Sequence, residues 1–330
     1  MSEPRMRAVT YAQAIRTALR EEMKADEKVI LFGEDVGQYG GVYGATTGLQ
    51  REFGEDRVRD TPISEMAIAG MAVGAALAGF RPVAEIMYCD FLTHASDAVV
   101  NNAAKWRYMS GGQFRLPIVF RSPAGGGAGY AAQHSQNLEA WFTHIPGLKV
   151  VMPGLPRDAR GLLRAAIRDD NPVVFLEHKG HYTFKGEIPA EGEIIPLGVA
   201  KIQRPGKDAT LVSWSRTLTY CLDAAEKLSE DGIDVEVLEP LTLQPLDVDA
   251  ICESAGRTGN LIIAHEAVVF GGLGAEIATQ VTQRLWGSLK KPPLRIGAPF
   301  VPVPYSEPME MFVVPQVGRI VTEVKQYLGG

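Results

Sequence analysis

The stretch DTPISEMAIAGMAVGAALAGFRPVAEIM (residues 60–87) combines an apolar helix pattern with an apolar strand pattern that follows it directly. The nearly apolar run at 66–80 has 15 residues, fewer than the roughly 20 that a helix needs to span a bilayer. We therefore expect this run to form a buried helix of a globular domain. The segment PVAEIM (82–87) predicts a strand of the adjoining sheet.

Apolar runs of the same kind recur along the first half of the chain. They are VILF (29–32), PIVF (117–120), KVVM (149–152) and PVVFLE (172–177). Continuous apolar strands separated by helices are typical of a largely parallel sheet that is covered on both faces. Thr10 and Gln13 form a capping-box signature at the start of a first amphipathic helix.

The length of 330 residues indicates about two domains. Residues 186–208 contain several prolines and glycines, and we interpret them as an irregular connection between domains 1–185 and 209–330. Beyond this connection the strand patterns resume at 209–214, 234–239, 260–266 and 293–298, with helix patterns at 217–230 and after residue 274. Both domains are thus predicted to be α/β, the second being the smaller.

The composition is that of an ordinary globular protein. Its 33 basic and 39 acidic residues give a net charge of −6, and no stretch collects enough Lys and Arg to bind a row of phosphates. Neither nucleic acid nor a membrane is an expected partner. Cys89, Cys221 and Cys252 lack CxxC spacing, which argues against a disulfide framework or a zinc knuckle. The first residues contain no apolar core of signal-peptide length, so we expect a cytoplasmic location.

Glu65 is the only ionisable side chain between Asp60 and Arg81, and it precedes the apolar helix. One interpretation is a first-turn carboxylate that interacts with the helix dipole. The other starts from Gly70 and Gly74, one turn apart, which let another backbone approach closely and so favour a protein interface. A carboxyl group at the rim of such an interface is partly desolvated, which favours its protonated form and suits acid or base catalysis near neutral pH.

The glycine-rich loop SPAGGGAGYAAQHSQ (122–136) follows a predicted strand and precedes a helix expected from about Asn137. Loops at the carboxyl ends of parallel strands are where ligands bind, so His134 is a candidate functional residue. The glycine spacing matches GxGxxA, but the next strand lacks the acidic residue that would hold a ribose, and a proline interrupts the turn. We therefore reject a dinucleotide-binding fingerprint.

Two further motifs carry weaker signals. FGGLGAEIA (270–278) opens a predicted helix after a strand, and close packing of strand against helix explains its glycines best. HKGH (178–181) offers two histidines without an obvious third ligand, so a zinc site is not expected there. The sequence contains neither a GxSxG serine elbow nor a Walker loop.

Several motifs occur in an order that resembles one protein family. They are GEDVG (33–37), DTPISE (60–65), RYMSGG (107–112), PIVFRSP (117–123), AAQHSQ (131–136), PGLKVVMP (146–153) and AIRDDNPVVFLE (166–177). From about residue 7 to its end, the chain resembles the beta subunits of the thiamine-diphosphate-dependent decarboxylating components of 2-oxo acid dehydrogenase complexes. The resemblance implies a transketolase-like fold, with a pyrimidine-binding parallel-sheet domain followed by a C-terminal α/β domain used for assembly.

The resemblance also implies roles for individual residues. Glu65 would hydrogen-bond the pyrimidine ring nitrogen of thiamine diphosphate and drive tautomerisation of its amine, and Phe91 and Met87 would contact the same ring. His134 matches the active-site histidine of the family, a proton donor or anchor when the acyl group passes to a lipoyl arm.

A monovalent cation, usually potassium, is implied by the same resemblance. Family members bind it mainly through main-chain oxygens, and the matching positions here are Ile118, Ala166, Ile167, Asp169 and Asn171. The alternative is that 169–171 is an ordinary helix-ending turn before a proline. In either case the role of this segment would be structural.

The expected assembly follows from a motif that the sequence lacks. Thiamine enzymes hold the diphosphate through magnesium, using a GDG segment that this chain does not contain. The resemblance therefore implies an alpha subunit that supplies the diphosphate and magnesium ligands. It further implies an alpha2beta2 heterotetramer that docks on a lipoyl acyltransferase core.

The implied reaction is oxidative decarboxylation of a 2-oxo acid with reductive acylation of lipoyl groups. The AAQHSQ loop favours pyruvate, but branched-chain 2-oxo acids and acetoin are handled by closely similar beta subunits. Two other classes stay open. They are an NAD-dependent dehydrogenase, which the broken fingerprints disfavour, and a noncatalytic assembly subunit.

Overall fold

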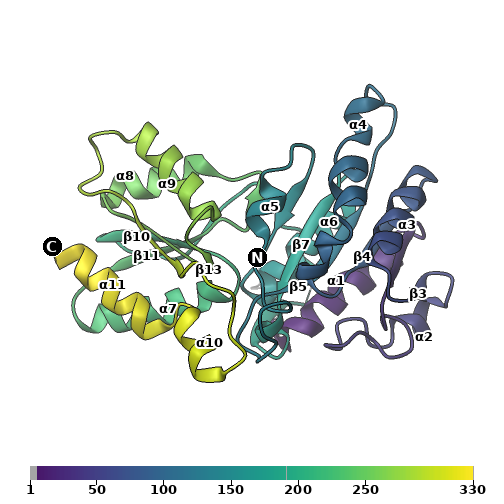
Figure 1. Cartoon of the computed structure of the whole chain (residues 1–330), viewed down its shortest axis with the longest axis horizontal. Helices are drawn as coiled ribbons and strands as arrows, with labels where there is room; N and C mark the ends of the chain where they lie inside the picture. The colour runs from purple at the N-terminus through teal and green to yellow at the C-terminus, as the bar shows by residue number, and fades with distance from the viewer. Residues whose placement is uncertain (1–5, 191, 330) are drawn as a thin grey trace. The chain divides into compact units, whose positions relative to one another are not determined.

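A parallel β-sheet forms the centre of the first of two units into which the chain divides (Figure 1). The computed structural model describes residues 6–190 and 192–329. The first unit contains the chain up to Ala124 together with Trp141–Leu197, and the second contains Gly125–Ala140 together with the chain from Gly198 onward. These units differ from the division predicted from the sequence in the placement of residues 125–140, and the predicted connection 186–208 is divided between them after Leu197.

The sheet of the first unit has the strand order β6-β7-β5-β4-β2-β3, and every neighbouring pair in it is parallel. The five strands predicted for this half are thereby confirmed, with ends that shift by no more than a few residues, whereas the short strand at 58–60 is not among the predicted ones. The strands are β2 (Val29–Gly33), β3 (Val58–Asp60), β4 (Arg81–Glu85), β5 (Val119–Ala124), β6 (Lys149–Val151) and β7 (Val173–His178).

Helices and short helical segments flank this sheet. They are α1 (Tyr11–Ala25), α2 (Leu49–Phe53), α3 (Glu65–Leu77), η1 (Cys89–Thr93), η2 (Asp97–Ala103), α4 (Trp106–Met109), α5 (Glu139–Thr143), α6 (Pro156–Arg168) and η3 (Lys179–His181). The predicted capping box at α1 is present, because the Thr10 hydroxyl accepts from the Gln13 N–H at 3.2 Å and the Gln13 side chain accepts from the Thr10 N–H at 2.9 Å. Helix α1 packs against α6, and their facing sides are joined by ion pairs such as Arg164 with Glu22 at 2.7 Å.

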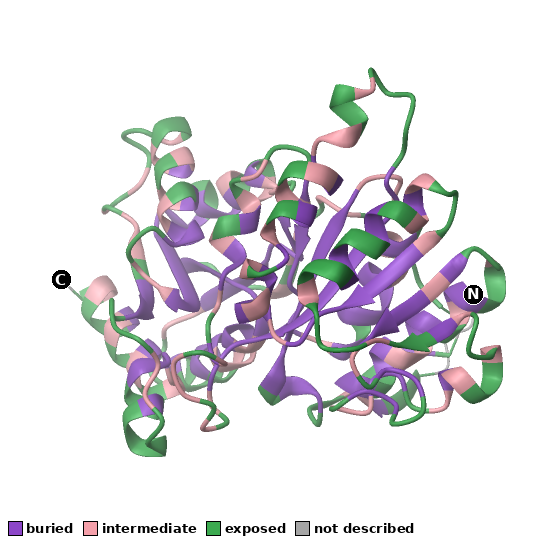
Figure 2. Cartoon of the chain, turned by 45° about the vertical axis from the view of Figure 1, so that its right-hand side comes forward, coloured by how far each residue is buried: buried purple, intermediate pink, exposed green. Residues whose placement is uncertain are grey.

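Helix α3, predicted to be a buried helix, is buried on one face only. Its inner face is buried, with Ile68 and Ala72 inaccessible to solvent, but Met66 is 61% and Met71 is 48% exposed. The outer face therefore appears exposed beside the buried sheet in Figure 2. One side of α3 packs against the sheet, and the other side carries small and apolar residues without a charge.

The second unit is built on a sheet with the order β14-β13-β10-β11-β9, in which only the pairing of β9 with β11 is antiparallel among the described pairs. Its strands are β9 (Lys201–Arg204), β10 (Ala209–Ser213), β11 (Val235–Glu239), β13 (Leu261–Val268) and β14 (Leu294–Ala298), and a short strand, β12, spans Thr242–Gln244. Its helices are α7 (Ser215–Glu230), α8 (Val248–Thr258), α9 (Leu273–Arg284), α10 (Glu307–Val313) and α11 (Val317–Gly329). The predicted α/β pattern of this half is confirmed.

The segment 186–208 is less irregular than its proline and glycine content predicts. Strand β8 (Lys185–Pro189) pairs antiparallel with β1 (Met6–Thr10), and β9 forms an edge of the second sheet. Both strands are short, and the prolines of the segment stand at the end of β8, between the two strands and directly after β9. Backbone pairing with a neighbouring strand thus outweighs the local turn signals.

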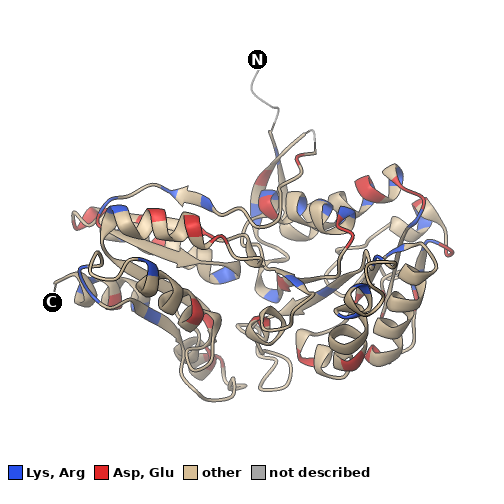
Figure 3. Cartoon of the chain, turned by 90° about the horizontal axis from the view of Figure 1, so that it is seen from above, with Lys and Arg blue, Asp and Glu red and all other residues tan. Residues whose placement is uncertain are grey.

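Acidic and basic residues are mixed over both units, in keeping with the small net charge (Figure 3). Among the described helices none is long and apolar enough to cross a membrane.

A buried ion cluster joins three adjacent strands of the first sheet. Arg121 of β5 donates to both carboxylate oxygens of Glu177 on β7, at 2.6 and 2.8 Å, and to Glu85 on β4 at 2.5 Å. The Tyr182 hydroxyl donates to Glu177 at 2.7 Å. All four side chains are buried, so each charge depends on its partners for the solvation that water would otherwise give.

We predict that Arg121→Met destabilises the chain by about 3 to 5 kcal/mol, because it leaves two buried carboxylates without a cation. The free energy of unfolding from urea titration measures this. As a matched control, Arg157→Met removes a guanidinium from an exposed pair with Glu193 and is expected to cost less than about 1 kcal/mol. Equal losses in the two variants would contradict the prediction.

Candidate functional site

The carboxyl ends of β2, β3 and β4 meet at one edge of the first sheet. Gly33 is the register partner of Asp60 on one side and of Glu85 on the other. The backbones approach so closely there that a Cβ on Gly33 would lie 2.5 Å from the Glu85 carbonyl oxygen. Residues that follow these strands are therefore brought together, as expected for ligand sites of parallel sheets.

Glu65 and Phe91 both lie next to His94 at this edge. Glu65 is the first residue of α3, and its side chain is 12% exposed. Its Oε2 lies 3.5 Å from Nδ1 of His94, whose ring centroid is 5.6 Å from that of Phe91 on η1. Met87, buried shortly after β4, belongs to the same chain segment as Phe91.

Glu34, the first residue after β2, is a second carboxyl group of this edge. Burial, reinforced by the negative charges of Glu65, Asp35 and Glu85, raises the pKa of Glu34 to about 7. Its Oε1 is buried and has no hydrogen-bond partner among the described residues. Near neutral pH both the acid and the carboxylate form of Glu34 are therefore accessible.

No motif of the sequence assigned a role to Glu34 or His94. A polar residue directly after a buried strand is a usable signal, and it would have identified Glu34. His94 gave no comparable signal, because its place beside Glu65 depends on how η1 folds back after β4.

His134 lies in the second unit, on the loop that leads from β5 to α5. The residue is half-buried, and its N–H donates to the Ala131 carbonyl at 3.4 Å. Helix α5 begins only at Glu139, so no helix follows the loop's glycines in the tight turn of a dinucleotide-binding motif. The structure thus agrees with the rejection of that fingerprint.

The two weaker motifs have structural roles. A Cβ on Gly274 would lie 2.8 Å and one on Gly272 would lie 2.9 Å from the buried His265 side chain, so these two glycines of 270–278 serve close strand-helix packing, whereas a Cβ on Gly271 would meet nothing within 4 Å. In HKGH the Nδ1 of His178 accepts from the Gly180 N–H at 3.0 Å. Within the described chain, no group of three or more His, Cys, Asp or Glu side chains is placed to hold a metal ion.

The five positions assigned to a cation lie at one end of the first sheet. The carbonyl oxygen of Ile118 accepts from the N–H of Val173, and those of Ile167 and Asp169 accept from Arg81 at 2.8 and 2.9 Å. Oδ1 of Asp169 accepts from both the N–H and the side chain of Asn171, at 2.8 Å each. The segment is thus an ordered turn rich in oxygen acceptors.

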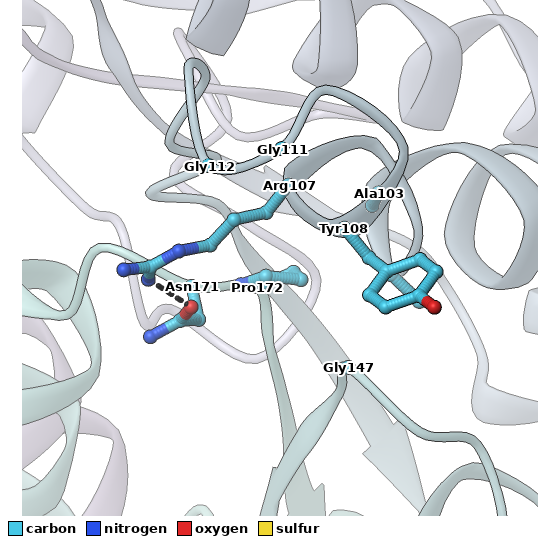
Figure 4. Close-up of a pocket in the computed structure, with 9 residues that line it drawn as sticks. Ala103, Arg107, Tyr108, Gly111, Gly112, Gly147, Asn171 and Pro172 are labelled. Carbon is cyan, nitrogen blue, oxygen red and sulfur yellow. Dashed lines mark hydrogen bonds between the residues drawn. The ribbon is translucent and has the colours of Figure 1, made fainter.

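Lys149 already supplies one positive charge to this turn, through an ion pair with Asp169. Burial alone would raise the pKa of the Asp169 carboxyl, but hydrogen bonds from Lys149 and Asn171 lower that pKa below its ordinary value. A cavity of about 500 Å³ opens beside Asn171, and Figure 4 shows Arg107 pointing to the Asn171 side chain, to which it donates.

The raised pKa of Glu34 leads to a prediction about stability and pH. Because the folded chain binds this proton more tightly than the unfolded chain, the stabilisation is complete below about pH 4.5 and is lost as the pH rises through about 7. Glu34→Gln should therefore flatten the fall in unfolding free energy between these pH values, as measured by urea titration. The exposed Glu55→Gln serves as control and should leave the slope unchanged. Parallel curves for wild type and Glu34→Gln would refute the shift.

Comparison with known proteins supports the architecture at two levels. Residues 7–185 match the family model of the transketolase pyrimidine binding domain, and residues 198–320 match that of the transketolase C-terminal domain. A solved structure described as a split gene transketolase, inactive beta4 tetramer, has a TM-score of 0.80 at 22% identity, and the alignment covers 97% of this chain and 98% of that chain. At this identity the likeness concerns the fold alone.

Curated relatives are much more similar in sequence. The pyruvate dehydrogenase E1 component subunit beta of Rhizobium meliloti is 47% identical, and the alignment covers 97% of this chain and 70% of that protein. The 2-oxoisovalerate dehydrogenase subunit beta of Bacillus subtilis is 42% identical over 97% of this chain and 99% of that protein. The mitochondrial pyruvate dehydrogenase E1 component subunit beta of Bos taurus is 45% identical over 97% and 90%, respectively. The chain therefore belongs to the family of E1 component beta subunits of 2-oxo acid dehydrogenases.

Proposed function

We propose that the strand-end site of the first unit binds the aminopyrimidine ring of thiamine diphosphate, with Glu65 as hydrogen-bond partner of a ring nitrogen. The observation that carries this proposal is the pairing of two carboxyl groups, Glu65 and Glu34, beside Phe91 at the edge where three strands end. When bound, thiamine diphosphate supplies an acidic C–H bond and an electron sink for decarboxylation of a 2-oxo acid.

The residues present fit such a ring. Glu65 is partly buried, so that a hydrogen bond to a ring nitrogen replaces lost solvation, and Phe91 and Met87 provide aromatic and apolar surface. The Glu65 carboxyl group would hydrogen-bond the ring nitrogen, and the protonated form of Glu34 keeps the local negative charge low. The family model of a pyrimidine binding domain over residues 7–185 supports the same assignment.

His134 is proposed to act later, as a proton donor or anchor when the acyl group passes to a lipoyl group. Its half-buried imidazole stands on a loop at the carboxyl end of a parallel strand, where ligands of such sheets bind. An imidazole exchanges protons readily near neutral pH.

An alpha subunit is proposed to complete the site with the diphosphate and magnesium ligands. The chain contains no GDG segment, and the outer face of α3 is apolar and exposed. Nothing within 4 Å would meet a Cβ at Gly70 or Gly74, so this face is open to a second backbone. We propose an alpha2beta2 heterotetramer docked on a lipoyl acyltransferase core, and we retain a cytoplasmic location as a prediction.

Pyruvate is the proposed substrate. The relatives named pyruvate dehydrogenase reach 47% identity, against 42% for the relative named 2-oxoisovalerate dehydrogenase. Branched-chain 2-oxo acids are the second candidate, because that latter relative matches over nearly its whole length. Comparing turnover of pyruvate, 2-oxoisovalerate and acetoin by the reconstituted enzyme decides among them.

We predict that Glu65→Gln and His134→Ala impair different steps. Glu65→Gln cannot supply the ring proton, so exchange of the thiazolium C–H for deuterium should slow by about 10²- to 10⁴-fold. His134→Ala should leave that exchange nearly normal and slow acyl transfer to a lipoyl domain. Quenched-flow NMR of the reconstituted heterotetramer measures the exchange, and single-turnover acylation measures the transfer.

Each result has a clear contrary outcome. If Glu65→Gln exchanges at the wild-type rate, its carboxyl group is only a first-turn residue at the helix dipole. If both variants support full turnover, the chain is a noncatalytic assembly subunit.

A potassium ion is proposed at Ile118, Ala166, Ile167, Asp169 and Asn171, where α6 ends and the turn at 169–171 follows. Carbonyl, carboxylate and amide oxygens are the ligands that potassium takes in proteins, and each carbonyl retains a second lone pair beside its hydrogen bond. The ion would add a positive charge to a turn that Lys149 and Arg81 already stabilise. Its role would be structural.

We predict that potassium raises the melting temperature, by a stabilisation of about 2.7 kcal/mol at one hundred times its dissociation constant. An organic cation at equal ionic strength should not replace it. Asp169→Asn should abolish the response, whereas Asp170→Asn, which instead loses pairs with Arg81 and Arg115, should keep it. A melting temperature indifferent to potassium would count against the site.

A further inference from the structure

Two buried carboxylates of the second unit hold the glycine-rich loop that carries His134. Glu310 of α10 accepts from the N–H of Gly127 at 2.7 Å and from the N–H of Gly129 at 3.0 Å, one with each carboxylate oxygen. Glu266 of β13 accepts from the N–H of Gly126 at 2.6 Å. Glu310 is 1% and Glu266 is 8% exposed, so these bonds are shielded from water.

Glycine is required for this arrangement. Gly127 has φ +85° and Gly129 has φ +71°, the left-handed region that side chains disfavour. A Cβ on Gly127 would also lie 2.3 Å from a guanidinium nitrogen of Arg216. This backbone lets the N–H groups of Gly127 and Gly129 converge on one carboxylate, and hydrogen bonds to an ionised acceptor are the strong ones.

The segment with His134 is fixed on both sides. On its N-terminal side, Glu310 binds Gly129. On its C-terminal side, the Gln136 carbonyl accepts from the Gly125 N–H at 3.1 Å, and the Asn137 side chain donates to Glu266 at 3.1 Å. The short stretch 130–135 is thus held between two anchored points.

We propose that Glu310 is a positioning residue for His134, acting through the glycine-rich loop together with Glu266. The inference rests on the proposed role of His134. It gives the C-terminal unit a task beyond assembly, because α10, near the end of the chain, sets the position of a histidine more than 170 residues earlier in the sequence.

The first test uses Glu310→Gln in the heterotetramer reconstituted with its alpha subunit, with pyruvate and a lipoyl domain as probes. The amide offers one acceptor and turns an N–H₂ donor toward a glycine N–H, so one bond of the clamp is lost. Acyl transfer should slow by about 10- to 100-fold, the effect of one charge-assisted hydrogen bond, while thiazolium exchange stays within about twofold. Glu307→Gln, an exposed residue of the same helix, is the matched control and should change neither rate.

A double variant separates positioning from general damage. If Glu310 acts through His134, then Glu310→Gln adds no further loss of acyl transfer in the His134→Ala background. Additive losses, or equal losses of exchange and transfer in the single variant, would overturn the inference. A normal transfer rate in His134→Ala alone would instead refute the proposed role of the histidine.

A measurement that needs no cofactor follows the loop itself. Amide hydrogen exchange in the peptide covering 125–136 should be about 10- to 100-fold faster in Glu310→Gln than in wild type or Glu307→Gln. Asn137→Ala provides a milder second variant, which loosens the other end and should slow transfer several-fold only when His134 is present. Unchanged loop exchange in Glu310→Gln would overturn the clamp.

Discussion

The guanidinium of Arg121 is the contact on which the first unit most depends, because it neutralises carboxylates of two neighbouring strands at the end where the site is built. Without it, Glu85 and Glu177 would repel one another in a buried setting. The cluster holds β4, β5 and β7 in register, and Glu85 is also the strand partner of Gly33. The register of these strands therefore determines where the residues that follow each strand lie.

The electrostatics of the site follow from that arrangement. Glu34 is partly buried near Glu65 and Glu85, which raises its pKa to about 7, whereas hydrogen bonds from Lys149 and Asn171 lower the pKa of Asp169. The pKa values of these two carboxyl groups are thus shifted in opposite directions, because their neighbouring groups differ. The same logic distinguishes the second unit, where Glu310 is surrounded by N–H donors and serves as an acceptor.

The apolar outer face of α3 and the glycine-rich loop show how small residues serve different purposes. On α3, Gly70 and Gly74 leave an open surface, which suits a second chain. In the loop, Gly127 and Gly129 permit a backbone shape that directs N–H groups at one side chain. Glycine content alone does not distinguish these two roles, because they differ in the backbone angle φ of the glycine and in the group that faces it.

The sequence by itself determined the two α/β halves, nearly every strand of both sheets, the cap of α1, the candidate residues Glu65 and His134, and the family. These depend on periodicity, local hydrogen bonding and ordered motifs, which neighbours along the chain supply. Tertiary structure alone decided that α3 keeps an exposed face and that 186–208 contains strands. It also decided that Glu34 and His94 lie beside Glu65. The contact by which Glu310 holds the loop of His134 likewise depends on the tertiary structure. Those features depend on contacts between residues distant in sequence. Burial and pairing supply the energy of these contacts, and no local sequence pattern indicates them.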